Sequence, residues 1–174
     1  FTSNKYQPQE GDWDTIKFKG AQRSTISYSV LNYATNALSI EIGDVEIQNC
    51  QISNSSQSGV YATGQNQALI RGNTIKSNQN GIRVAGNSTG VEISDNEVLS
   101  NSQNGIYIHA YAFAKAKRDL DKANASAQIR DVSISGNNVS YNQNGIYLHG
   151  EAVANASVYY RSNATANAFI YNVT

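Results

Sequence analysis

The chain has 174 residues, with 13 basic and 13 acidic side chains and a formal net charge of zero. No basic run is present that could displace counterions from phosphates, so nucleic acid is excluded as a partner. No stretch of about 18 apolar residues could span a membrane. The single cysteine, Cys50, excludes an internal disulfide. The length predicts one domain covering residues 1–174.

The N-terminal part contains short segments in which apolar and polar residues alternate. Trp13–Phe18 is the first, and Ile26–Val30 with Tyr33 and Leu38–Ile40 form a shorter unit after it. Apolar residues at positions i and i+2 point to the same face of an extended chain. These segments therefore predict β-strands with their apolar sides turned inward.

A short motif, Asn-Gln-Asn-Gly-Ile in its clearest form, recurs along the chain and is marked by Gly59, Gly81, Gly105 and Gly145. The glycines are 22, 24 and 40 residues apart. A repeat near 22 residues is typical of a solenoid, in which each unit buries its apolar side against its neighbours. The gap of 40 residues indicates an insertion within one unit.

Three short strands are predicted in each repeat. The first strands lie at 45–47, 68–70, 91–93 and 132–134, the second contain Ile52, Ile75, Val98 and Val139, and the third follow the glycines. We therefore predict an all-β chain folded as a parallel β-helix of about six rungs.

Polar residues recur at fixed places in the repeat. Two columns are expected to form hydrogen-bonded ladders: Asn73, Asn96 and Asn137 at one turn, where Cys50 takes the place of Asn, and Gln57, Gln79, Gln103 and Gln143 beside the glycines. Asparagine also tolerates the left-handed backbone that such corners require. Cys50 is expected to be a small buried substitute for asparagine.

Two alanine-rich insertions are predicted as β-hairpin arms, at about 109–127 and 150–168. Alanine stands at nearly every second position in both, which gives each strand a smooth face. We place the turns near 118–121 and 161–162. The competing prediction for the first insertion is an alanine-rich helix.

These segments together resemble the right-handed parallel β-helix repeat proteins, which include NosD-like and pectin-lyase-like groups and many archaeal surface proteins. The resemblance rests on Trp13–Phe18, Ser24–Tyr28, Leu31–Ala34 and the Asn-x-x-Gly-Ile rungs. It implies the fold over nearly the whole chain outside the insertions. It implies little about activity, because the matching residues build rungs rather than sites.

His109 and His149 each follow a repeat glycine by four residues, so they are expected on neighbouring rungs within reach of one metal ion. The NosD-like resemblance implies copper handling as one alternative. Two histidines without a nearby cysteine, methionine or clustered carboxylate form a poor metal site. The sequence therefore favours two hinge residues at the base of the arms.

Enzymes of this fold that cleave polysaccharides use stacked acidic residues, and glycoside hydrolysis requires paired carboxylates in one groove. The outward column after the glycines contains instead Tyr61, Arg83, Tyr107 and Tyr147. This stripe is suited to packing against an arm, and alternatively to stacking on sugar rings. We therefore predict no enzymatic activity and no cofactor.

Asn-x-Ser/Thr sequons predict surface glycosylation sites in an exported protein. They stand at Asn54, Asn87, Asn124, Asn138, Asn155, Asn163 and Asn172. We predict an extracellular structural protein that forms a filament, sheath or surface layer with copies of itself, through the arms and the open ends of the β-helix. The alternative is a domain that binds or cleaves a surface polysaccharide.

Overall fold

The computed structural model describes residues 1–174 except 65, 117–121 and 157–162. The regular elements of the described part are all β-strands, and no helix there is long and apolar enough to cross a membrane. In chain order the strands are β1 (Ile16–Ser27), β2 (Val30–Asn32), β3 (Asn36–Gln48), β4 (Gln51–Ser53), β5 (Ser58–Thr63), β6 (Asn66–Arg71), β7 (Thr74–Lys76), β8 (Asn80–Ala85), β9 (Glu92–Ser94), β10 (Glu97–Leu99), β11 (Asn104–Ala116), β12 (Lys122–Ser135), β13 (Asn138–Ser140), β14 (Asn144–Ala156) and β15 (Asn163–Val173).

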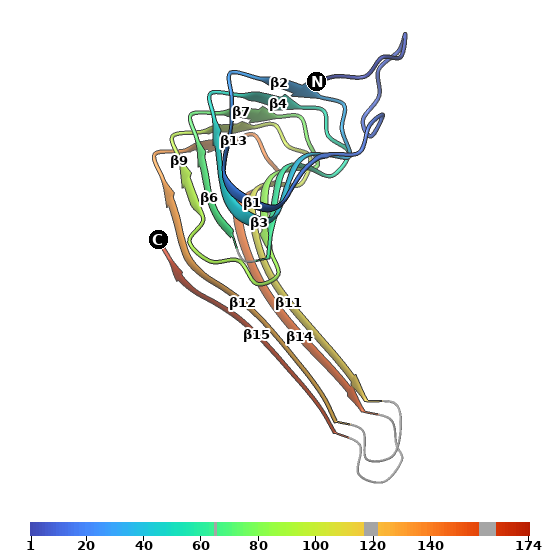
Figure 1. The fold of residues 1–174 in the computed structure, drawn as a ribbon, viewed down its shortest axis with the longest axis vertical. Coiled ribbons are helices and arrows are strands. Elements are labelled where there is room, and N and C mark those ends of the chain that lie inside the picture. Colours follow the sequence, from blue (N-terminus) through green and yellow to red (C-terminus); the bar gives the residue numbers. More distant parts are fainter. Residues whose placement is uncertain (65, 117–121, 157–162) are drawn as a thin grey trace.

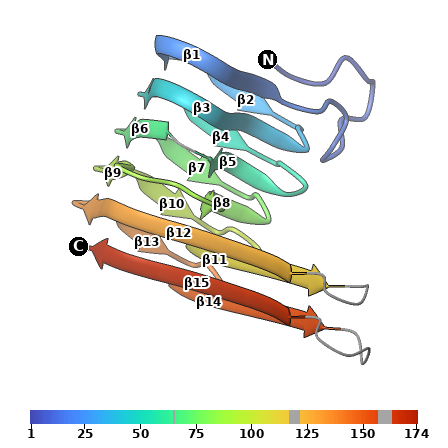
Figure 2. The same ribbon diagram turned by 60° about the horizontal axis from the view of Figure 1, so that its bottom comes forward.

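The chain winds as a solenoid, and each coil places a strand beside the equivalent strand of the coil before it (Figure 2). One sheet has the order β13-β10-β7-β4-β2, and a ten-stranded sheet runs β14-β11-β8-β5-β3-β6-β9-β12-β15, with β1 beside β3. All of these pairings are parallel. The predicted parallel β-helix is therefore confirmed.

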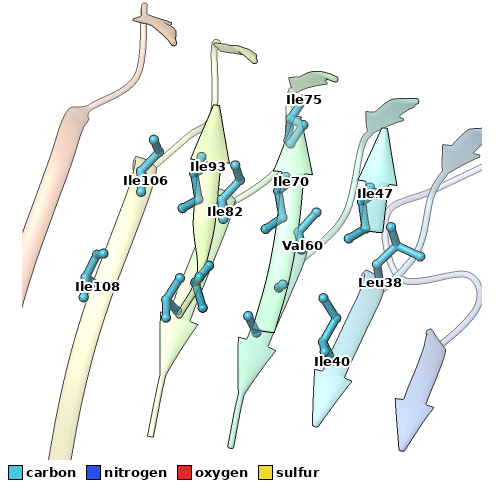
Figure 3. Packing of buried hydrophobic residues seen from close by; sticks show 14 of the residues in the cluster. Leu38, Ile40, Ile47, Val60, Ile70, Ile75, Ile82, Ile93, Ile106 and Ile108 are labelled. Carbon is cyan, nitrogen blue, oxygen red and sulfur yellow. The ribbon is translucent and has the colours of Figure 1, made fainter. Parts of the chain in front are cut away.

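The core is a set of apolar columns that run from rung to rung (Figure 3). The register pairs Leu38 with Val60, Val60 with Ile82, and Ile82 with Ile106, and all four are completely buried. Each fully buried side chain of this size stabilises the fold by about 1.5–3 kcal/mol. The alternating apolar positions of the sequence therefore form the inner face of the solenoid.

The repeat glycine is required by close approach between rungs. A Cβ at Gly105 would lie 2.7 Å from the carbonyl oxygen of Gly145 and 2.8 Å from the Asn142 amide nitrogen. Left-handed backbone occurs elsewhere, at the residue before each ladder position: Asn49, Gly72, Asp95 and Gly136 have φ between 54° and 65°. The asparagine ladder thus follows the left-handed corner instead of occupying it.

The arms extend the coil (Figure 1) and are not hairpins. β11 pairs in parallel with β14 from Asn104↔Asn144 to Ala116↔Ala156, and β12 pairs in parallel with β15. Strands that leave the rungs in register keep hydrogen-bonding to the neighbouring rung. This pairing satisfies the backbone, so the outgoing and returning strands of one rung need not pair with each other.

The two layers of the arms meet through alanine side chains. Ala110, Ala112 and Ala114 of β11 and Ala127 of β12 are at most 3% exposed. The alanine face predicted from the sequence therefore packs against its counterpart on the returning strand. The first insertion is strand and not helix in its described part. The turns predicted at 118–121 and 161–162 lie outside the described residues.

Candidate functional site

An aromatic and basic column runs across the outer face of β5, β8, β11 and β14. The register pairs Tyr61 with Arg83, Arg83 with Tyr107, and Tyr107 with Tyr147. The Arg83 guanidinium lies 5.2 Å from the Tyr61 ring centroid and 5.5 Å from that of Tyr107. Tyr107 and Tyr147 stack with 5.4 Å between centroids. The structure thus brings the four predicted stripe residues together as one stacked column.

A second column lies two residues further along the same strands, at the base of the arms. The rings of His109 and His149 are stacked with 5.1 Å between centroids and 4° between planes. Glu151 follows on β14, and one ligand atom from each of the three residues lies within 4.8 Å of the others. These residues form the candidate site.

The environment of His109 favours a neutral imidazole. Burial is the main cause that lowers its pKa, Arg83 and His149 act in the same direction, and Glu151 opposes them. Arg83 Nη2 lies 3.5 Å from His109 Nδ1, and the Tyr107 hydroxyl lies 3.5 Å from His149 Nδ1. His109 Nε2 is buried and has no hydrogen-bond partner among the described residues.

Sequence reasoning did not include Glu151 in this group. The available signal was the alternation His149-x-Glu151, because residues two apart on a strand share one face. The missing information was the extent of the strand, since the predicted arm began at residue 150. In the structure β14 continues to Ala156 and keeps Glu151 in register with Tyr111.

The last rung leaves its inward side open. Ile146 and Leu148 are 49% and 46% exposed, whereas their partners in the preceding rung, Ile106 and Ile108, are completely buried. A Cβ at Gly145 would meet nothing within 4 Å. This end therefore presents an apolar face that the described residues do not cover.

Comparison with known proteins agrees with the geometry. A family model for a right-handed beta helix region matches residues 14–173. The chain belongs to this right-handed β-helix family. Neither the curated proteins nor the solved structures contain a match. The family assigns the handedness of the coil, and the site must be interpreted from its own residues.

Two asparagine ladders run along the turns of this β-helix. In the first, the Asn73 amide donates to Asn96 Oδ1 and the Asn96 amide to Asn137 Oδ1, both at 2.9 Å, while the backbone N–H of Cys50 donates to Asn73 Oδ1. Burial raises the pKa of the Cys50 thiol. The second ladder begins at the backbone N–H of Ser55, which donates to Asn78 Oδ1, and continues through Asn101 to Asn142.

The second ladder differs from the one we expected at the glutamines. Gln57, Gln103 and Gln143 are exposed and Gln79 is half-buried. No side-chain bond joins one glutamine of this column to the next in the described part of the chain. A third ladder lies at the strand starts that follow the glutamines, where Asn104 donates to Asn80 Oδ1 and Asn144 donates to Asn104 Oδ1. The glutamines lie in the bends just before β5, β8, β11 and β14 and are not part of these strands.

A groove of about 740 Å³ lies beside the returning arm strand. It is lined by Ile42, Gly43, Asp44, Gln67, Asn87, Thr89, Ser126, Gln128 and Arg130. Asp44 is the one carboxylate among these lining residues. The groove therefore does not offer the paired carboxylates that glycoside hydrolysis requires. Polysaccharide as a partner stays a prediction.

The sequons lie on several turns and strands of the β-helix. Asn87, Asn124, Asn138, Asn155 and Asn172 are exposed, and Asn54 is half-buried. Asn163 begins β15. Asn54 Nδ2 donates to Asn32 Oδ1 at 2.8 Å and Asn172 Nδ2 to Asp131 Oδ1 at 3.0 Å. Most of these positions leave room for an attached glycan.

Proposed function

We propose that this β-helix is an extracellular structural protein that associates end to end with further copies of itself to form a filament. The observation that carries the proposal is the exposure of Ile146 and Leu148, which are 49% and 46% exposed on the last rung. Solenoid repeat proteins usually end in capping units with a polar outer face. The apolar face that the described residues leave exposed here is a surface suited to a partner.

The strand edges of the last rung support the same proposal. Within the described residues, β14 pairs only with β11 and β15 only with β12. Each therefore offers one row of backbone N–H and C=O groups to another strand. Long unpaired edges of this kind are templates for pairing with another chain.

The first rung offers the matching surface. β1 pairs only with β3 in the described part of the chain, and its inward residues Ile16 and Phe18 are half-buried. The residues around Phe1 cover β2 instead: the Phe1 amino group donates to the Val30 carbonyl, and the Asn32 N–H donates to the Phe1 carbonyl. The other edge of β1 is therefore unpaired within the described residues.

A second copy of the chain is the favoured partner for the exposed face, because the apolar residues at the two ends of the β-helix belong to the same inward columns. Ile16 continues the column that ends at Ile146, and Phe18 continues the one that ends at Leu148. A copy placed with its β1 against β14 extends both columns by one rung. A contact between two different surfaces of the same protein repeats from copy to copy. It produces a filament when the copies do not close into a ring.

The extracellular location is supported by composition and by the sequons. Charged residues make up 15% of the chain, which is low for a cytosolic domain. Exposed sequons on the turns and arms suit a glycosylated surface protein.

The test is electron microscopy and light scattering of the purified protein at increasing concentration, with the variant Ile146→Lys plus Leu148→Lys beside it. We expect filaments from the natural sequence and monomers from the variant, because charges on an edge strand oppose pairing. Both side chains are already half-exposed, so the variant should fold normally, which circular dichroism would check.

Tyr141→Lys is the matched control, because Tyr141 belongs to the same rung and is 87% exposed at its corner. It should leave the filaments unchanged. A natural sequence that stays monomeric at high concentration would overturn the proposal. So would a double variant that still forms filaments.

A further inference from the structure

We propose that His109, His149 and Glu151 bind a divalent transition-metal ion of the Zn²⁺ class at the base of the arms. The proposal does not rest on assembly, although His149 and Glu151 stand on β14, the strand whose edge is assigned to assembly. The three side chains come from two neighbouring strands, and one ligand atom of each lies within 4.8 Å of the other two. No other group of three or more possible metal ligands of this kind occurs among the described residues.

The backbone places the three ligands on one face. His149 and Glu151 are two residues apart on β14, and His109 is paired directly with His149 across the parallel register. Atoms that share a tetrahedral zinc ion lie roughly 3.3 Å apart, since Zn–N and Zn–O bonds are about 2.0–2.2 Å. Small side-chain rotations are therefore enough to bring the three atoms to one ion, because the strands already fix the Cα positions.

The donor set selects the class of ion. Two imidazoles and a carboxylate suit Zn²⁺, Ni²⁺ and Cu²⁺, whereas the site lacks the thiolate or thioether that selects Cu⁺. Three protein ligands leave at least one position for water or an external ligand. His109 Nε2 is buried without a hydrogen-bond partner, and a bound ion would provide one for this atom.

The neighbouring residues modify the site in opposite directions. The Tyr107 hydroxyl is 3.5 Å from His149 Nδ1 and can orient that ring, as partners of metal-binding histidines do. Arg83 lies 3.5 Å from His109 Nδ1 and repels a cation.

Isothermal titration of the untagged protein with ZnCl₂ near neutral pH tests the proposal. We expect one ion per chain, and affinity reduced by at least about tenfold in His109→Ala, His149→Ala and Glu151→Gln. Arg83→Gln should bind Zn²⁺ more tightly than the natural sequence, because it removes the nearby positive charge. Electron paramagnetic resonance of the Cu²⁺ complex should show coupling to two imidazole nitrogens.

Glu97→Gln is the control, because Glu97 is an exposed carboxylate on β10, outside the cluster. It should bind Zn²⁺ with unchanged affinity. All variants are compared by circular dichroism and melting temperature to show that they are folded. Equal Zn²⁺ affinity in the natural sequence and a folded His109→Ala plus His149→Ala variant would overturn the proposal, as would no binding at all.

Discussion

His109 and His149 form a face-to-face pair in which the imidazole planes differ by 4° and the ring centroids are 5.1 Å apart. The separation is close to the spacing of about 4.8 Å between neighbouring strands. The rungs therefore fix the distance between the rings. Protonation of His109 would place a positive charge beside the Arg83 guanidinium, whose Nη2 lies 3.5 Å from His109 Nδ1.

The pH dependence of stability should reveal this arrangement. The pKa of His109 is lowered in the folded state, chiefly by burial, from an ordinary value of 6.5. The unfolded chain then binds the proton more readily, so stability falls as the pH drops below 6.5 and stops falling below the folded pKa. The melting temperature should therefore decrease between pH 8 and pH 5.

His109→Gln separates this effect from other titrations, because it keeps a polar side chain that cannot be protonated. Its melting temperature should decrease less over the same interval. The pKa of Asp12 is lowered to about 2, mainly by the hydrogen bond from Lys5, so its contribution is lost only at more acidic pH. Parallel curves for the two proteins between pH 8 and pH 5 would contradict this explanation.

Gly105 and Gly145 allow a paired test of rung stacking. Alanine at Gly105 places its Cβ 2.7 Å from the Gly145 carbonyl oxygen, and this backbone atom cannot move without shifting the last rung. We expect Gly105→Ala to lower the free energy of unfolding by about 1–3 kcal/mol. Gly145→Ala meets nothing within 4 Å and should change it by less than about 0.5 kcal/mol.

Urea denaturation at low protein concentration measures both glycine variants without interference from assembly. The informative quantity is the difference in the free energy of unfolding between the two variants, because both replace glycine by alanine at the same place in the repeat. Equal stability of Gly105→Ala and Gly145→Ala would show that the close approach between rungs does not explain the glycine.

The first asparagine ladder should contribute measurably to stability. Asn96 Oδ1 accepts hydrogen bonds from the backbone and the side chain of Asn73, and its amide donates to the Ile70 carbonyl at 2.8 Å. Asn96→Ala removes these bonds, and each buried group left without a partner, such as the Asn73 backbone N–H, costs about 1–3 kcal/mol. Thermal and urea denaturation should show a clear loss of stability.

Gln103→Ala serves as the comparison for Asn96→Ala, because Gln103 is exposed beside the second ladder. It should change the free energy of unfolding by less than about 0.5 kcal/mol. A loss as large as that of Asn96→Ala would mean that the glutamine column carries an interaction that the structure does not show.

The repeat predicted the coil because its signals are local and agree with one another. Ile52, Ile75 and Val98 recur at the rung spacing, and their burial required only the alternation of apolar and polar residues. The inward asparagines were harder to distinguish from the neighbouring glutamines. Asn78 and Gln79 differ by one position, and only the backbone path shows which of the two faces the core.

The pairing of the arm strands could not be predicted from the sequence. Alternating alanine predicts strands with a small-residue face, but it does not determine which strand each one pairs with. A hairpin and an extended coil contain the same outgoing and returning strands. The pairing of Lys115 with Asn155 depends on the rung register that precedes it, which is information from residues far away in the chain. Glu151 was missed for the same reason.

Shortening the arms tests whether the coil is stable without them. We expect a variant with 112–125 and 152–166 replaced by short glycine–asparagine turns to keep the β-helix, because each rung contacts mainly its neighbours. It loses the buried methyl groups of Ala112 and Ala114, so its melting temperature should fall by less than about 5 °C. Circular dichroism and thermal melting measure this, with Ile82→Ala as a core control expected to cost about 2–5 kcal/mol. A non-cooperative thermal transition of the shortened variant would contradict the prediction that the β-helix is stable without the arms.

Filaments should also persist in the shortened variant, because the exposed residues Ile146 and Leu148 remain. If a folded shortened variant formed no filaments, the contacts between copies would lie in the arms.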